Sequence, residues 1–163
     1  MVLRTQAKRL TVLVFTYAAN KTGDMFRDFC VPGASAVLLA QLVHKIRTAL
    51  KSEFDKQYLW SDSTVTLSWI RACPKRWKTF VANRVSEIQR LTNIEDWYHV
   101  RSKENPADIV SRGMSVEDLQ NSELWWSGPY WLSEDFLQLE SVDERIEDKM
   151  PEERTSSQFQ RIA

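Results

Sequence analysis

Apolar and polar residues alternate with the period of an α-helix in two long segments of the chain. In residues 34–53 the apolar side chains recur every three or four positions, and residues 77–91 carry a second stripe of the same kind. Both patterns predict amphipathic helices. The apolar positions expected to face the core are Val37, Leu38, Leu42, Ile46 and Leu50 in the first helix and Trp77, Val81, Val85, Ile88 and Leu91 in the second.

Shorter segments complete this pattern. Residues 57–60 and 95–100 are predicted to be short strands, and a short helix is predicted at 65–70. Asn105-Pro106-Ala107-Asp108 is typical of a helix start. The predicted order is helix, strand, helix, helix, strand, helix. Such alternation favours an α/β fold in which the two strands pair in parallel.

The N-terminal segment allows two interpretations. Residues 10–18 are apolar and β-branched, which favours a buried strand. Basic residues before this run (Arg4, Lys8 and Arg9) and Ala18-Ala19 after it also match the layout of a secretory signal peptide. We favour the strand because nothing downstream is typical of a secreted protein, and we expect an intracellular location, in the cytoplasm or nucleus.

The net charge of zero hides an uneven distribution of charge along the chain. The 163 residues, 43% hydrophobic and 27% charged, suit one globular domain, and no apolar run approaches the roughly 20 residues of a membrane-spanning helix. Residues 1–114 hold 18 Lys and Arg against 10 Asp and Glu, a difference of +8, whereas residues 115–163 hold 4 against 12, a difference of −8. We therefore expect a basic body and an acidic, disordered tail at 133–163.

Two carboxylates stand where α/β proteins often bind ligands. Asp62 follows the strand predicted at 57–60, and Asp108 lies in the first turn of a predicted helix. Each also has a purely structural interpretation. Asp62 suits a turn or a helix cap, and Asp108 completes a helix start with Asn105 and Pro106.

Five segments of the chain, in order, resemble a known family. They are residues 58–65, 76–85, 97–100, 105–113 and 124–132. Together they closely resemble the ribonuclease H-like region of BEL/Pao-type retrotransposon polyproteins, a family that also carries a peptidase label. The resemblance covers residues 36–132, and residues 1–35 match it poorly. It implies an α/β, ribonuclease H-like fold, a mixed sheet with flanking helices.

The resemblance implies metal-dependent cleavage of the RNA strand of RNA–DNA hybrids. In this family four carboxylates hold two divalent ions, Mg²⁺ or Mn²⁺, which activate a water and stabilise the leaving oxygen. Asp62 matches the carboxylate at the end of the fourth strand and Asp108 the one at the start of the last helix. The resemblance therefore assigns both residues as catalytic metal ligands.

The other two carboxylates of the family are not found. The chain has no stretch like the family's first strand with its Asp, and residues 31–36, where the family has a Glu, contain no carboxylate. Asp24 and Asp28 are not favoured as substitutes. We therefore expect an N-terminally truncated or rearranged copy, with an incomplete sheet whose first strands are missing, weak metal binding and impaired activity.

Basic residues between Ser63 and Ser86 suggest a second property, the binding of nucleic acid. This stretch contains no acidic residue and interleaves Trp69 and Trp77 with five cations: Arg71, Lys75, Arg76, Lys78 and Arg84. These cations could neutralise phosphates of an RNA–DNA hybrid or another nucleic acid. The alternative is that the tryptophans belong to the core and the charges form a solvated face. The resemblance adds other polyprotein domains, reverse transcriptase and integrase, as expected partners.

The sequence leaves other functions and sites open. A non-catalytic nucleic-acid or protein-binding remnant is the main alternative, and an aspartic-type peptidase is disfavoured because Asp62-Ser63-Thr64 lacks the required Gly. His99 suggests either a structural histidine or one that assists product release. We expect the aromatic run at 124–132 to pack on the core as a loop rather than to stack on bases. The scattered cysteines and histidines do not have the spacing of a zinc site.

Overall fold

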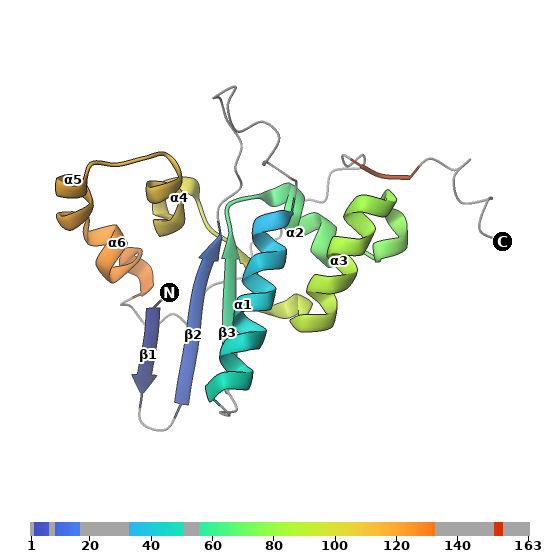
Figure 1. The fold of residues 1–163 in the computed structure, drawn as a ribbon, viewed down its shortest axis with the longest axis horizontal. Coiled ribbons are helices and arrows are strands. Elements are labelled where there is room, and N and C mark those ends of the chain that lie inside the picture. The colour runs from blue at the N-terminus through green and yellow to red at the C-terminus, as the bar shows by residue number, and fades with distance from the viewer. Residues whose placement is uncertain (1, 7–8, 17–32, 51–55, 133–151, 155–163) are drawn as a thin grey trace.

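A mixed four-stranded sheet forms the centre of the protein. The computed structural model describes residues 2–6, 9–16, 33–50, 56–132 and 152–154. The strand order is β1-β2-β3-β4, with bounds β1 Val2–Gln6, β2 Arg9–Thr16, β3 Lys56–Ser61 and β4 Trp97–His99. β1 pairs antiparallel with β2, whereas β2, β3 and β4 are parallel (Figure 1). The fold is therefore mixed α/β, and the predicted parallel pairing of β3 with β4 is confirmed.

The N-terminal strands correct one expectation. The strand predicted at residues 10–18 is β2, and it pairs with β3 from Thr11↔Lys56 to Thr16↔Ser61. β1, which the apolar pattern does not predict, joins β2 as an antiparallel hairpin. The predicted strand is therefore confirmed, whereas the expectation of an incomplete sheet whose first strands are missing is corrected, because β1 and β2 precede α1 and β2 pairs with β3.

The helices follow the predicted order along the chain. Between β2 and β3 runs the longest helix, and two helices connect β3 to β4, as the alternation of patterns predicted. Three short α-helices follow β4 within the described residues up to 132. The bounds are α1 Ala34–Leu50, α2 Thr64–Arg71, α3 Thr79–Leu91, α4 Pro106–Ser111, α5 Val116–Gln120 and α6 Glu123–Ser127.

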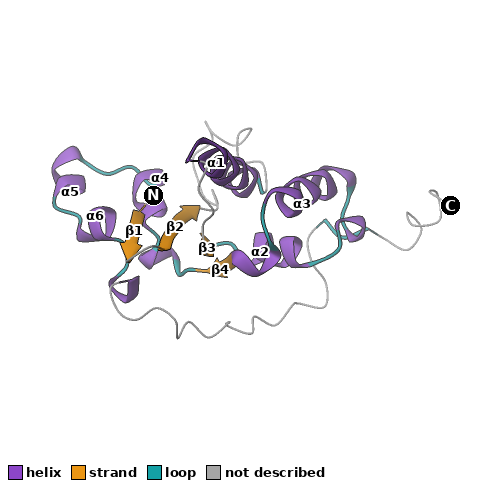
Figure 2. Cartoon of the chain, turned by 90° about the horizontal axis from the view of Figure 1, so that it is seen from below, coloured by secondary structure: helices purple, strands orange, loops and turns teal. Residues whose placement is uncertain are grey.

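β3 is buried on both of its faces. Successive side chains of a strand point to opposite sides, and Leu59 belongs to the core under α1 and α3, whereas Tyr58 and Trp60 belong to a second core. Figure 2 shows α1 on one side of the sheet. On the other side Trp131 contacts Trp60, with ring centroids 5.7 Å apart. The strand is thus central, as a short apolar run predicts.

The aromatic run at 124–132 is more helical than expected. Its first half belongs to α6, where Trp126 is 66% exposed, and its second half forms a short 3-10 helix, Tyr130–Leu132. Only this second half packs on the core, through Trp131 and the buried Leu132. The expected packing is therefore confirmed for the end of the run, while its conformation as a loop is corrected.

The face that α1 buries differs from the predicted one. The buried residues are Ala36, Leu39, Ala40 and Val43, whereas Leu38 and Leu42 are exposed. The two buried alanines have small side chains, which allow the close approach of α1 to its neighbours. The first half of α1 is apolar on several sides, so periodicity alone could not select the face. In α3, by contrast, the predicted stripe of Val81, Val85, Ile88 and Leu91 is buried as expected.

Candidate functional site

The carboxyl edge of the parallel strands carries both predicted carboxylates. Asp62 directly follows β3, and its Oδ2 lies 3.5 Å from the Oγ of Ser102, in the short turn that leads from β4 to α4. Asp108 lies in the first turn of α4, which Figure 1 shows beside the end of β2. Asp62 thus lies at the end of a strand and Asp108 in the first turn of a helix, as the sequence predicted.

Two serines fix the turn that presents Asp62. The Oγ of Ser61, at the end of β3, accepts a hydrogen bond from the main-chain N–H of Ser63 at 3.2 Å. The Oγ of Ser63 accepts the N–H of Thr66 at 3.2 Å and so caps α2. The proposal that Asp62 itself caps this helix is wrong, because Ser63 has that role.

Asp108 fits the structural interpretation of a helix start. Asn105 is fully buried, and its Oδ1 accepts the main-chain N–H of Ala107 at 3.1 Å. The Asp108 carboxylate forms an ion pair with Arg112, with 2.8 Å between Oδ2 and Nη2. An acid in the first turn and a cation one turn later both stabilise a helix. Asp108 therefore serves α4 whether or not it has a further role.

Asn105 is the residue on which the position of Asp108 most depends. We expect Asn105→Ala to lower the free energy of unfolding by about 1–3 kcal/mol, because it removes a cap and leaves buried polar groups unpaired. Urea unfolding measures this loss. Ser115→Ala, which removes the exposed cap of α5, is the control and should lose about 0.5–1 kcal/mol. Equal losses in the two variants would contradict the structural role of Asn105.

The donor set at this edge does not fit a two-metal centre. Within the described ranges no group of three or more His, Cys, Asp or Glu side chains could hold a metal ion. β2, the neighbour of β3, has the sequence RLTVLVFT without a carboxylate, and the first turn of α1 has no acid. Asp24 and Asp28 lie outside the described residues. Two carboxylates, one of them paired with Arg112, are fewer than two clustered divalent ions need.

His99 lies at the same edge. It is the last residue of β4, is half-buried, and stands opposite Ser61 in the parallel register. This position in a regular strand suits the structural interpretation of the histidine. A role in product release remains a prediction.

Four of the five predicted basic residues lie in a surface loop between α2 and α3. We call residues 71–78 the basic loop; it begins at Arg71 in the last turn of α2 and ends at Lys78, directly before α3. Lys75 and Lys78 are exposed, and Arg76 is half-buried. Lys78 is the residue directly before α3, and the first turn of that helix contains no acidic residue, so the positive end of the helix dipole adds to the charge of the loop. This arrangement attracts anions.

The two tryptophans of this stretch belong to a small core next to the basic loop. Trp69 and Trp77 are buried with Val81 and Val85 in a small core, and the indole N–H of Trp77 donates to the carbonyl of Trp69 at 3.2 Å. The amide of Gln89 on α3 donates to the carbonyls of Ile70 and Ala72. The core interpretation of both tryptophans is therefore confirmed, and neither ring is available to stack on a base.

Three residues of the acidic tail contact the basic loop. Trp77 and Glu153 form an antiparallel bridge, flanked by hydrogen bonds of 2.9 Å from Lys78 N–H to Glu152 O and from Arg154 N–H to Arg76 O. Glu153 Oε1 lies 2.7 Å from Arg76 Nε, and Glu152 Oε2 lies 3.2 Å from Lys78 Nζ. The expectation of a disordered tail therefore does not hold for residues 152–154, while the rest of the tail lies outside the described residues.

Arg84, the fifth predicted cation, is separate from the loop. Its guanidinium lies 3.4 Å from the centroid of the Phe80 ring, and it donates to the Phe80 carbonyl at 3.2 Å. Partial burial lowers the pKa of Arg84, although arginine stays charged in proteins. The Arg84 guanidinium thus packs against its own helix, α3. Of the five predicted cations, Arg84 is therefore the weakest candidate for a phosphate contact.

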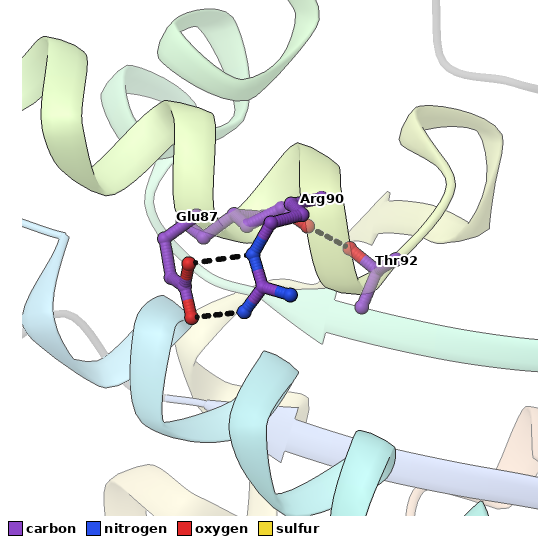
Figure 3. A network of polar contacts seen from close by, with 4 residues as sticks. Glu87, Arg90 and Thr92 are labelled. Atoms are coloured by element: carbon purple, nitrogen blue, oxygen red, sulfur yellow. Dashed lines mark hydrogen bonds and ion pairs between the residues drawn. The ribbon is translucent and has the colours of Figure 1, made fainter.

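Glu87 is the first acidic residue after the basic stretch, and it does not pair with the loop. Arg90 donates two hydrogen bonds to its carboxylate, at 3.0 and 2.8 Å (Figure 3). The hydrogen bond from Arg90 is the main reason that the pKa of Glu87 is lowered. The negative charge of Glu87 is therefore compensated locally. At the C-terminal end of the same helix, the Thr92 hydroxyl donates to the Ile88 carbonyl and accepts the indole N–H of Trp97.

Comparison of the chain with models of known protein families, with curated proteins and with solved structures finds no match. Among the residues that the structure describes, no helix is both long and apolar enough to cross a membrane.

Proposed function

We propose that this protein is a ribonuclease H-like domain of retroelement origin that binds nucleic acid through its basic loop and lacks an efficient metal centre for cleavage. RNA–DNA hybrid is the expected ligand because the resembling family acts on it. The observation that carries the proposal is the basic loop itself, which has four cations and no acidic residue of its own. Two of these cations already bind carboxylates, those of Glu152 and Glu153.

The arrangement of the basic loop suits phosphate binding without base readout. Lys and Arg side chains neutralise phosphates irrespective of sequence, and no aromatic ring of this loop is open to a base, because its one aromatic residue, Trp77, is buried. We therefore expect affinity without sequence preference and with strong salt dependence. Reverse transcriptase and integrase domains of a parent polyprotein stay predicted partners.

The sheet supports the ribonuclease H-like part of the proposal. Strands β2, β3 and β4 are parallel, Asp62 directly follows β3, and Asp108 lies in the first turn of α4, an arrangement compatible with the one that the resemblance implies. The missing carboxylates argue against efficient cleavage. If Asp62 and Asp108 are the carboxylates of the site, Mg²⁺ or Mn²⁺ would bind weakly, since affinity follows the number and charge of the ligands.

Cleavage of a labelled RNA–DNA hybrid tests this proposal. We expect the folded wild-type chain to produce no more cleavage in Mg²⁺ or Mn²⁺ than the Asp62→Asn variant, because neither has a complete site. Cleavage by the wild type that disappears in Asp62→Asn would contradict the proposal and show that other groups complete the metal centre. A cooperative unfolding transition for both proteins is the control for folding.

A further inference from the structure

The contact between residues 152–154 and the basic loop brings the acidic end of the chain to the surface proposed for nucleic acid. We infer that Glu152 and Glu153 compete with nucleic-acid phosphates for Lys78 and Arg76. Residues 152–154, which we call the acidic segment, thus occupy part of the site until nucleic acid displaces them. This inference rests on the proposed function and adds a regulatory contact within the same chain.

The register of the main chain makes the pairing specific. The hydrogen bonds that flank the Trp77–Glu153 bridge align the two segments in antiparallel register. This alignment sets Glu152 opposite Lys78 and Glu153 opposite Trp77, and from there the Glu153 carboxylate reaches the side chain of the adjacent Arg76. Each carboxylate thus stands at a cation that a phosphate oxygen would otherwise contact.

The contact between residues 152–154 and the basic loop is weak enough to be displaced. The paired side chains remain partly exposed, at 34% and 30% for Arg76 and Glu153 and at 52% and 43% for Lys78 and Glu152. Ion pairs of this exposure are weak and are screened by salt. Glu152 also adopts a φ of 66°, a left-handed conformation that is unfavourable for a residue with a Cβ atom. A nucleic acid, which presents many phosphates at once, can therefore replace the two glutamates.

The exposed Lys75 gives nucleic acid a first point of attachment beside the occupied cations. It lies in the same turn, Pro74–Arg76, and no described residue of the acidic segment forms an ion pair with it. Phosphates that gather at Lys75 raise the local concentration of competing anions at Arg76 and Lys78. Displacement can thus begin without prior opening of the contact.

The test compares hybrid binding by three full-length proteins. The wild type, Glu152→Gln/Glu153→Gln and the control Glu117→Gln/Glu123→Gln are titrated with a labelled RNA–DNA hybrid in EDTA, with fluorescence anisotropy as the readout. The control removes the same charge from α5 and α6, which Figures 1 and 2 place at the far end of the molecule from α3. We expect the first variant to bind about three- to tenfold more tightly than the control.

Hydrogen exchange of the Arg154 amide gives a second readout that reports on the contact itself. This amide donates to the Arg76 carbonyl, and hybrid should remove its protection in the wild type. Equal affinity of the two variants, or an Arg154 amide that stays protected in the complex, would overturn the inference and leave the proposed function standing. If none of the three folded proteins binds hybrid, the proposed function fails, and the inference fails with it.

Discussion

Replacement of Trp77 by Ala should remove about 3–5 kcal/mol from the free energy of unfolding, as expected for a buried tryptophan. The side chain is 1% exposed, packs against Trp69 with ring centroids 6.4 Å apart, and holds the loop through its indole hydrogen bond. Domains of this size are stable by only about 5–15 kcal/mol, so the change is a large part of the total. Urea unfolding followed by circular dichroism measures it.

Trp126→Ala is the matched control for this substitution. Trp126 is 66% exposed on α6 and makes one side-chain hydrogen bond, to the Gln120 carbonyl at 3.1 Å. We expect its removal to change the free energy of unfolding by about 1 kcal/mol or less. Similar losses in the two variants would show that Trp77 is not a core residue, and the support of the basic loop would need another explanation.

Neutralisation of the exposed loop lysines should weaken hybrid binding on the order of 50- to 100-fold at 0.1 M salt. Each phosphate contact contributes about 0.9 to the slope of log K against log salt, so Lys75→Gln/Lys78→Gln should flatten that slope by about 1.8. Both side chains are exposed, and Arg76, whose guanidinium lies 5.2 Å from the centroid of the Trp77 ring, is left in place. The fold should therefore be retained. Anisotropy titrations at several salt concentrations measure both quantities.

Two exposed cations on α1 provide the charge-matched control. Lys45→Gln/Arg47→Gln removes the same charge from another helix, and both residues are exposed. This variant should keep the wild-type slope within error, because only the general attraction of the basic body is reduced. If both double variants lose affinity equally, binding depends on total charge and the basic loop is not a site.

Local sequence patterns predicted which segments form helices and strands, but they did not always predict which face of a helix is buried. In α3 polar residues surround one apolar stripe, so the buried positions could be predicted. In α1 the exposed Leu38 and the buried Leu39 are equally apolar, and the choice depends on how closely Ala36 and Ala40 approach their neighbours. β1 was missed because its five residues, VLRTQ, become a strand only by pairing with β2.

The candidate sites show the same division between local and distant contacts. Asp62 and Asp108 could be placed from the sequence because each stands at the end or start of a recognisable element. The contact of Glu153 with Arg76 could not be predicted, since 77 residues separate the partners and no periodic pattern links them. Overall charge suggested only that an acidic tail and a basic body coexist. The structure adds which charges meet.

Equilibrium binding of a labelled RNA–DNA hybrid to the full chain in EDTA, measured over a series of salt concentrations, tests the central claim most directly. Four cations in the basic loop predict metal-independent binding whose log K falls with log salt at a slope of about −3 to −4. Absence of binding at low salt, from protein that unfolds cooperatively, would contradict the claim. Binding that requires Mg²⁺ would contradict it as well, because it would place the nucleic acid at the carboxylate edge.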